Sequence, residues 1–340
     1  MIDFFENKWL NQLLLTCSYL FDYSIVSPRS ACVAISKYCN SRCVYCNNWN
    51  NKDEKDISFS TLKTLFVELQ NLRVREIVIS GGEPLMRSDI IDIIVMARSM
   101  GFSVRVLSNG LLLTTDILKK FDEIGVTRIG ISIDSLNPAI YTKVRGTDGK
   151  HILSLLNDLD GADYKVQIVL YSVLSTYNVA ELETLLNFCA SHNFGAYFQA
   201  LECDRNNQCI RDDIKLIWPK SEQILHIRKI CDKIISNREK YNFVVTSDEY
   251  LHGLADYYNL QTATPPKCYA GYTRINIDKH LNVLPCWQLE PVGNIQNDSI
   301  RDIWKSKKMN EARSRIRKLD CPGCWFPCHI ETSYTKGTRT

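Results

Sequence analysis

The sequence has 340 residues, of which 45% are apolar and 23% charged; this composition is that of a globular protein and excludes a disordered or fibrous chain. The net charge of +3 is too small to favour nucleic acid or an anionic membrane as partner. No signal peptide opens the chain, and no apolar run reaches the roughly 18 residues of a membrane span. The chain has fourteen cysteines, and we expect a cytoplasmic protein in which part of them bind metal and none form disulfides.

The first two thirds of the chain predict alternating strands and helices. Residues 1–30 are expected to form an N-terminal helical cap. Strand-like runs then occupy 31–36, 76–80, 103–108, 128–134, 165–171 and 196–201. Three of the intervening helices are expected to start after Ser60, Ser88 and Thr115, and glycines at 101 and 125 end two of them. Six strand–helix units predict an α/β fold with a parallel sheet, two units short of a closed TIM barrel.

The remainder of the chain differs in character. Residues 204–265 are predicted to be mostly helical, and Thr264-Pro265-Pro266 marks a boundary. The last part contains a predicted hairpin between two cysteines. We therefore divide the chain into 1–30, 31–203, 204–265 and 266–340.

Three cysteines, Cys39, Cys43 and Cys46, have the spacing C-x3-C-x2-C in the loop after the first predicted strand. One loop of this kind can hold three irons of a [4Fe–4S] cluster and leave the fourth iron open for a substrate or cofactor. A zinc site needs four ligands as a rule, and the nearest histidine, His151, is far away in sequence. Zinc or ordinary thiols stay open as alternatives on this motif alone.

The second predicted strand runs into Gly81-Gly82-Glu83-Pro84. Together with the cysteine motif, this string resembles the radical S-adenosylmethionine (SAM) enzymes. The resemblance implies a partial (β/α)6 TIM-like barrel over 31–203. It also implies a [4Fe–4S] cluster on the three cysteines, SAM bound at the open iron, and reductive cleavage of SAM to a 5′-deoxyadenosyl radical. A protein such as flavodoxin or ferredoxin would supply the electron.

The same resemblance assigns roles near SAM. Gly81, Gly82 and Pro84 would lie at its methionine end, with Glu83 accepting a hydrogen bond from its amino group, and Tyr45 would lie at its adenine. Contacts with SAM are also implied for Asn109, Ser132 and Arg145, which lie at or beyond the carboxyl ends of predicted strands. Read from the residues alone, Ser132 could be a strand-end hydroxyl and Arg145 a solvated charge, whereas Asn109 and Asp134 could be turn or capping residues.

A second cysteine set follows residue 266. Cys268, Cys286, Cys321 and Cys324 offer four thiolates, and their spacing alone also suits a zinc ribbon. The string from Gly293 to Trp304 is similar to the linker of SPASM/twitch extensions, which implies an auxiliary [4Fe–4S] cluster. Five cysteines, counting the uncommitted Cys328 as a possible replacement for Cys324, suit the one-cluster twitch type.

That resemblance leaves one departure in the predicted hairpin. The related extensions usually have a glycine five residues before the second cysteine, and this chain has Leu281 there. We therefore expect a different hairpin turn. Further along, a basic run over 301–318 could attract a phosphorylated or carboxylated substrate, or could be the solvated face of one helix.

Three functions follow as expectations. Similarity to one-cluster twitch enzymes, including an aminocyclitol alcohol dehydrogenase, implies redox modification of a small metabolite with the auxiliary cluster accepting an electron. The alternative is modification of a peptide by crosslinking, thioether formation or epimerisation. Only 38 residues precede Cys39, too few for a leader-peptide recognition domain unless a separate protein supplies it. A non-catalytic iron–sulfur or zinc protein is the alternative from another class.

One further cysteine lies at the functional end of the sixth predicted strand. Some radical SAM epimerases use a thiol to return a hydrogen atom, and Cys203 or Cys209 could do this. A buried small hydrophobic side chain is the simpler reading.

Overall fold

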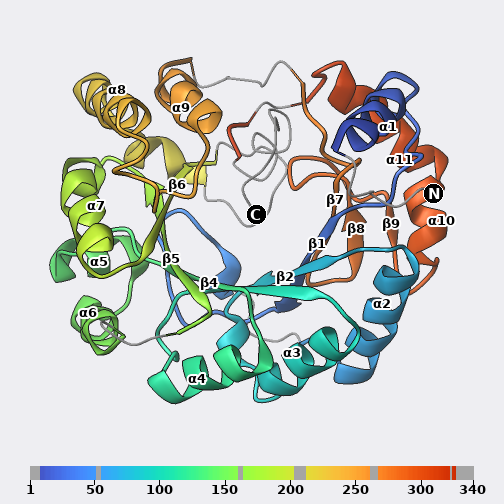
Figure 1. Ribbon diagram of the computed structural model, residues 1–340, viewed down its shortest axis with the longest axis horizontal. Helices are drawn as coiled ribbons and strands as arrows, with labels where there is room; N and C mark the ends of the chain where they lie inside the picture. Colours follow the sequence, from blue (N-terminus) through green and yellow to red (C-terminus); the bar gives the residue numbers. More distant parts are fainter. Residues whose placement is uncertain are drawn as a thin grey trace.

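One curved sheet of nine strands frames the protein in a computed structural model that describes residues 8–50, 55–159, 164–202, 212–260, 267–321 and 324–326. The strand order is β6-β5-β4-β3-β2-β1-β7-β8-β9. Strands β1 to β7 pair in parallel, and β8 and β9 are antiparallel additions. Helices lie on the outside of the arc that the strands form (Figure 1). The described strands leave the sheet open between β6 and β9, as in a partial barrel.

All six predicted parallel strands are present, in consecutive order from β1 to β6. The nine strands are β1 Ser30–Ser36, β2 Glu76–Gly81, β3 Ser103–Ser108, β4 Arg128–Ser132, β5 Gln167–Leu174, β6 Gly195–Ala200, β7 Arg274–Ile277, β8 Asn282–Leu284 and β9 Gly293–Asn294. The main difference from expectation is β5, which begins two residues later and ends three residues later than predicted. β1 is buried along its full length, because it lies in mid-sheet between β2 and β7.

The helices follow the strands around the outside. They are α1 Lys8–Leu20, α2 Phe59–Asn71, α3 Ile90–Ser99, α4 Thr115–Ile124, α5 Pro138–Arg145, α6 Gly149–Asp158, α7 Leu182–Ser191, α8 Ser221–Ser236, α9 Asp248–Leu260, α10 Ile300–Lys305 and α11 Lys307–Arg317. The N-caps of α2, α3 and α4 are Ser58, Asp89 and Thr114. The predicted start was therefore two residues late for α2, one residue early for α3 and one residue late for α4. Gly125 ends α4 in the left-handed conformation, as predicted.

The predicted helical region after β6 covers an edge of the sheet. Ala196 in β6 donates to Phe243 O (3.0 Å) and accepts from Val245 N (2.9 Å), which extends the ladder by one parallel bridge. Nearby, the Tyr250 hydroxyl on α9 accepts from Ala200 N (2.8 Å). An open strand edge is thereby paired or covered.

Helix α1 packs on the C-terminal part of the chain, whereas we expected it to cap a barrel end. Its side chains Leu15 and Tyr19 form a small apolar cluster of their own with Tyr269 and Tyr272. After the helix, Asp22 accepts two hydrogen bonds from Arg317 on α11 (2.7 and 2.8 Å). Helices α1 and α11 therefore lie side by side, although they are far apart in the sequence (Figure 1). None of the described helices is long and apolar enough to span a bilayer.

The C-terminal segment continues the main sheet through the pairing of β7 with β1. Its hairpin turn corrects one expectation, because Leu281 takes the left-handed conformation that glycine favours (φ 67°) and the β7–β8 hairpin forms normally. The basic run also differs from a single solvated helix face. It is split between α10 and α11, and Arg313 is fully buried, with its guanidinium 4.5 Å from the Trp304 ring centroid and donating to Gly271 O (2.8 Å).

Candidate active site at the cysteine loop

The loop that carries Cys39, Cys43 and Cys46 is fixed to the end of β2 by close backbone contacts. Gly82 N donates to Ser36 O (2.8 Å), and Glu83 N donates to Tyr38 O (2.6 Å). A Cβ on Gly82 would lie 1.9 Å from Tyr38 O, and one on Gly81 would lie 2.5 Å from Ser36 O. Both glycines therefore permit the protein's own backbone to approach, which positions the start of the cysteine loop.

The middle of the loop is held by the end of α5. Arg42 N donates to Arg145 O and Val44 N donates to Val144 O, both at 2.9 Å, so that Cys43 lies between two anchored residues. Gly146 follows in the left-handed conformation (φ 65°), and a Cβ there would lie 2.9 Å from Arg42 O. At the far end of the loop, the Trp49 indole donates to Cys46 O (2.8 Å), a contact that the sequence pattern gave no reason to expect.

Each of the three sulfurs accepts from a nitrogen donor. Asn109 Nδ2 lies 3.9 Å from Cys39 Sγ, Arg145 Nη1 lies 3.9 Å from Cys43 Sγ, and Asn48 N lies 3.5 Å from Cys46 Sγ. Burial raises the pKa of the Cys39 thiol to about 11 and also raises the pKa of Cys43. Without a metal both thiols are therefore protonated at neutral pH, whereas hydrogen bonds to sulfur favour the thiolates that iron binds.

Asp134, Arg145 and Tyr45 form a buried polar network beside Cys43. Arg145 Nε lies 2.6 Å from Asp134 Oδ2, and its Nη2 donates to Oδ1 (3.0 Å). The Tyr45 hydroxyl donates to Oδ2 (2.7 Å), and the guanidinium lies 5.4 Å from the Tyr45 ring centroid. Burial is the largest single effect and would lower the pKa of Arg145, but attraction to Asp134, added to that of Tyr45, Cys43 and Tyr141, raises the pKa. Arg145 is 6% exposed, so the solvated-charge reading is wrong.

Glu83 is buried and its carboxylate faces the protein. Its oxygens accept from Leu85 N (3.0 Å), Ser108 Oγ (2.8 Å) and Asn109 N (2.6 Å). Burial raises the pKa of Glu83, and the hydrogen bonds from these three donors lower it by less, so that the pKa is raised on balance. Glu83 therefore ties the ends of β2 and β3 together, and its expected hydrogen bond with the SAM amino group stays a prediction. Asn109, placed by this tie, donates to Asn40 Oδ1 (2.7 Å) and Ser41 Oγ (3.0 Å) in the cysteine loop.

Ser132 and Pro84, the remaining predicted SAM contacts, also lie near the cysteine loop. Ser132 is the last residue of β4 and is half-buried, and Pro84 is buried at the start of the short 3-10 helix Pro84–Met86. Both lie at the carboxyl edge of the sheet with the cysteine loop, as predicted for a parallel α/β site. Cys203, Cys209 and Cys328 lie outside the described residues.

The second cysteine set is distributed along the C-terminal segment. Cys268 precedes β7, and Cys286 follows β8 with its sulfur accepting from Gln288 N (3.4 Å). Cys321 follows α11, and Cys324 adjoins Trp325, whose indole donates to Tyr250 O on α9 (2.8 Å). None of these four, nor any other described cysteine, is in a disulfide. No three Cys, His, Asp or Glu side chains in the described ranges gather closely enough to hold a single metal ion.

Two family models match the chain. The Radical SAM superfamily model matches residues 33–189, and the SPASM model, an iron–sulfur cluster-binding domain, matches residues 268–325. The first match contains the cysteine loop, Gly81–Pro84 and Arg145. The chain belongs to the radical SAM superfamily. It is a radical SAM enzyme with a SPASM C-terminal extension, and the second match contains Cys268, Cys286, Cys321 and Cys324.

Individual relatives are distant. The PqqA peptide cyclase of Rhizobium meliloti (strain 1021) is 22% identical over 331 residues, covering 88% of this chain and 83% of that protein. A probable GTP 3′,8-cyclase of Methanocaldococcus jannaschii is 26% identical over 225 residues, covering 63% and 72%. Among solved structures, Streptococcus suis SuiB bound to its precursor peptide SuiA superposes with a TM-score of 0.70 at 15% identity, covering 99% of this chain and 80% of that one. At this identity the likeness shows the fold.

The radical SAM family implies a [4Fe–4S] cluster that binds SAM, and the SPASM extension implies auxiliary iron–sulfur clusters. The residues of the cysteine loop fit the SAM-binding [4Fe–4S] cluster, because three thiols on one loop each accept an N–H hydrogen bond. A cluster takes each thiolate on a different iron, so its ligands need not converge on one point. When bound, it supplies the electron that breaks the sulfonium C–S bond of SAM. Asn109 and Arg145 would hold Cys39 and Cys43 in place and donate to their sulfurs.

Proposed function

We propose that this radical SAM enzyme binds its cluster through Cys39, Cys43 and Cys46, cleaves SAM reductively there, and removes a hydrogen atom from a substrate. The observation that carries the proposal is the set of anchors converging on one loop, from β2, β3 and α5. In this arrangement Gly81 and Gly82 shape the chain at the methionine end of SAM, Pro84 lies beside them, and Glu83 accepts a hydrogen bond from the SAM amino group. Tyr45, Asn109, Ser132 and Arg145 line or brace its remaining surface.

In the C-terminal extension we propose that Cys268, Cys286, Cys321 and Cys324 hold one auxiliary [4Fe–4S] cluster, with Cys328 as the alternative fourth ligand. We retain the division into 1–30, 31–203, 204–265 and 266–340. We also propose a cytoplasmic location and reduction by a flavodoxin or ferredoxin. Cys203 is proposed as a hydrogen donor only for a reaction that returns a hydrogen atom to the substrate.

Two substrate classes are proposed. The first is a peptide, and the support is that the PqqA peptide cyclase aligns with 88% of this chain. The second is a small metabolite that is oxidised, with the auxiliary cluster accepting the electron. Its support is the relation to GTP 3′,8-cyclases, whose named substrate is a small molecule. The longer alignment favours the peptide.

A cavity of about 400 Å³ is a candidate binding site for part of either kind of substrate. It lies at the same edge of the sheet as the cysteine loop, since Lys37 follows β1, Lys279 and His280 follow β7, and Lys55 precedes α2. Asp56 is the single acidic residue in its lining. This excess of positive charge favours a substrate with carboxylate or phosphate groups. The volume is in the range of small-molecule sites.

The test is anaerobic reconstitution followed by SAM cleavage with dithionite. We expect about eight irons per chain for two cubane clusters and formation of 5′-deoxyadenosine. Cys43→Ala should abolish cleavage, whereas Cys189→Ala, at a buried core thiol of α7 that belongs to neither cysteine set, should keep it. Absence of 5′-deoxyadenosine from fully loaded protein would refute the proposal, and four irons with one zinc would refute the auxiliary cluster.

The substrate class is tested separately by isotope transfer. Peptides encoded beside the gene and small metabolites of the neighbouring pathway are supplied in deuterated form. Deuterium found in 5′-deoxyadenosine identifies the class that donates the hydrogen atom. Transfer from a metabolite and from no peptide would reverse our preference.

A further inference from the structure

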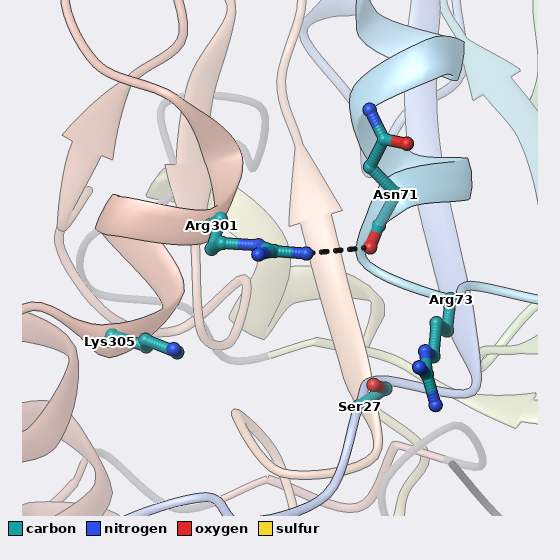
Figure 2. Close-up of a pocket in the computed structure, with 5 residues that line it drawn as sticks. All are labelled: Ser27, Asn71, Arg73, Arg301 and Lys305. Atoms are coloured by element: carbon teal, nitrogen blue, oxygen red, sulfur yellow. Dashed lines mark hydrogen bonds between the residues drawn. The ribbon is translucent and has the colours of Figure 1, made fainter. Parts of the chain in front are cut away.

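A second, smaller cavity lies at the opposite edge of the sheet from the cysteine loop. It has a volume of about 190 Å³ and is lined by Ser27, Asn71, Arg73, Arg301 and Lys305 (Figure 2). Ser27 precedes β1, and Asn71 and Arg73 precede β2, whereas the cysteine loop and Gly81–Pro84 follow those strands. The cavity is therefore separate from the candidate active site.

Three of its five lining residues are cations without an acidic partner in the part of the chain that the structure describes. Arg301 Nη2 donates to the backbone oxygen of Asn71 (3.2 Å), and neither Arg73 nor Lys305 forms an ion pair there. Each of the two helices contains one acidic residue, and both of these residues are engaged at the start of α10. Asp302 accepts from Ser299 Oγ (2.6 Å), and Glu68 accepts from Ile300 N (2.5 Å). The lining of the cavity itself thus carries three positive charges and no negative charge.

Ser27 adds an independent observation. It is 1% exposed, and its hydroxyl is buried without a hydrogen-bond partner in the described structure. A buried hydroxyl left unpaired is unfavourable, and a bound water or ion that the structure does not contain is one explanation for such a group in a native protein. Because Ser27 lines the cavity, an oxygen atom bound there would satisfy it.

Arg73 occupies a position that helices usually give to glycine. It follows the C-cap Leu72 of α2 and has a φ of 66°, in the left-handed region. Glycine adopts this conformation without strain, whereas arginine does not. Arg73, a residue that lines the cavity, therefore has a strained backbone conformation.

From these observations we propose that the cavity binds the phosphate group of a small phosphorylated ligand. Cations from two separate segments and one hydroxyl surround a single space (Figure 2). A tetrahedral group with several acceptor oxygens can meet all of these donors at once, and guanidinium groups suit phosphate oxygens. The volume equals roughly six water molecules, enough for a phosphate group but not for a large ligand.

Binding there would also fasten two parts of the protein together. Asn71 ends α2 and Arg73 follows it in the radical SAM region, while Arg301 and Lys305 belong to α10 in the SPASM segment. A bound phosphate would cancel the repulsion among the three cations and join α10 to α2. The ligand would therefore stabilise the packing of the SPASM segment against the barrel, whether or not SAM is being cleaved.

The experiment is titration of the reconstituted enzyme with inorganic phosphate by calorimetry, at constant ionic strength maintained with sodium chloride. We expect saturable binding of one phosphate per chain and a rise in the melting temperature with phosphate concentration. Arg73→Gly should weaken binding at least tenfold while folding at least as well as the parent without phosphate, because it removes the cation and the backbone strain together. Arg301→Gln should also weaken binding.

Lys308→Gln is the matched control, because Lys308 is exposed on α11, carries the same charge and does not line the cavity. Its phosphate affinity should equal that of the parent, and all variants should retain SAM cleavage. Absence of saturable binding, unchanged affinity in Arg73→Gly, equal weakening by Lys308→Gln, or acetate binding as tightly as phosphate would each overturn the proposal. These outcomes are independent of SAM cleavage and of the proposed function.

Discussion

Arg145 and Asp134 form an ion pair, with Nε 2.6 Å from Oδ2, in which the side chains are 7% and 0% exposed. The pair joins the end of α5 to the segment after β4, and it reaches the cysteine loop twice, through Cys43 Sγ and the Tyr45 hydroxyl. A buried pair of this kind fixes geometry even where its net contribution to stability is small. The position of Cys43 therefore depends on a charge located 102 residues further along the chain.

Removing one partner of this pair should be costly. In the apo-protein, Arg145→Met keeps much of the side-chain volume but leaves Asp134 buried without its counter-ion. We expect the free energy of unfolding to fall by about 3–5 kcal/mol. Denaturant unfolding measures it. The matched control is Arg105→Met, which breaks an ion pair with Glu76 whose side chains are 24% and 25% exposed, and which should cost about 1 kcal/mol or less. Equal losses in both variants would contradict the prediction.

The raised pKa of Cys39 predicts low reactivity in the apo-protein. Burial is the main cause of a pKa of about 11, against 9.0 for the free thiol. At pH 8 the thiolate fraction is then roughly 100-fold lower than that of a free cysteine, so alkylation should be correspondingly slow. Mass spectrometry of iodoacetamide-treated apo-protein measures the rate at each cysteine. Cys39 reacting as fast as a cysteine in the urea-unfolded chain would contradict this.

The raised pKa of Cys39 also makes the stability of the apo-protein depend on pH. The folded state holds the Cys39 proton more tightly than the unfolded state, so its contribution to stability is present below pH 9 and is lost as the pH rises from 9 to 11. Cys39→Ala apo-protein should lack this part of the pH dependence. Because iron binds the thiolate, reconstitution of the parent should also become faster as the pH rises toward 9.

Gly253 on α9 supports the segment that carries Cys324. A Cβ at this position would lie 1.9 Å from Cζ2 of Trp325, so Gly253→Ala must displace the indole. Alanine favours a helix by about 1 kcal/mol, but the clash is with a large buried ring and should outweigh this. We expect lower stability and fewer irons per chain, with SAM cleavage retained. Iron analysis and thermal unfolding measure both effects.

Two variants isolate the cause. Asn259→Ala, at an exposed position of the same helix, should not lower stability. In a Trp325→Ala background, Gly253→Ala should become neutral or stabilising, because the clash is gone. If Gly253→Ala is equally harmful with and without Trp325, the contact does not explain the loss.

The strands and the cysteine loop could be predicted because each is encoded locally. The apolar runs before Cys39 and Gly81 are short and rich in β-branched residues, and the motifs follow them directly. The hydrogen bonds that Glu83 accepts within the protein could not be predicted, because its partners Ser108 and Asn109 are supplied by the next strand and the residue after it. The same holds for Arg313, which is charged in sequence but is enclosed by Trp304 and Gly271 through tertiary packing.

Leu281 provides a test of backbone strain in the SPASM hairpin. It is 6% exposed and has a φ of 67°, so it combines a buried apolar side chain with a conformation that suits glycine. Loss of a buried leucine side chain costs about 2–5 kcal/mol, whereas the left-handed conformation costs a non-glycine residue about 1–2 kcal/mol. Burial therefore outweighs strain, and both Leu281→Gly and Leu281→Ala should be less stable than the parent.

The relative stability of the two variants separates the effect of side-chain burial from that of backbone strain. Alanine loses the buried side chain and keeps the strain, whereas glycine loses the side chain but relieves the strain. Leu281→Gly should therefore be more stable than Leu281→Ala by about 1 kcal/mol, the reverse of the order expected at an ordinary strand position. The matched control is Val283 in β8, which is fully buried and is not among the residues with positive φ; there the alanine variant should be the more stable. Thermal unfolding of the four apo-proteins measures both orders, and an alanine variant at 281 that equals or exceeds the glycine variant would show that the turn carries no strain.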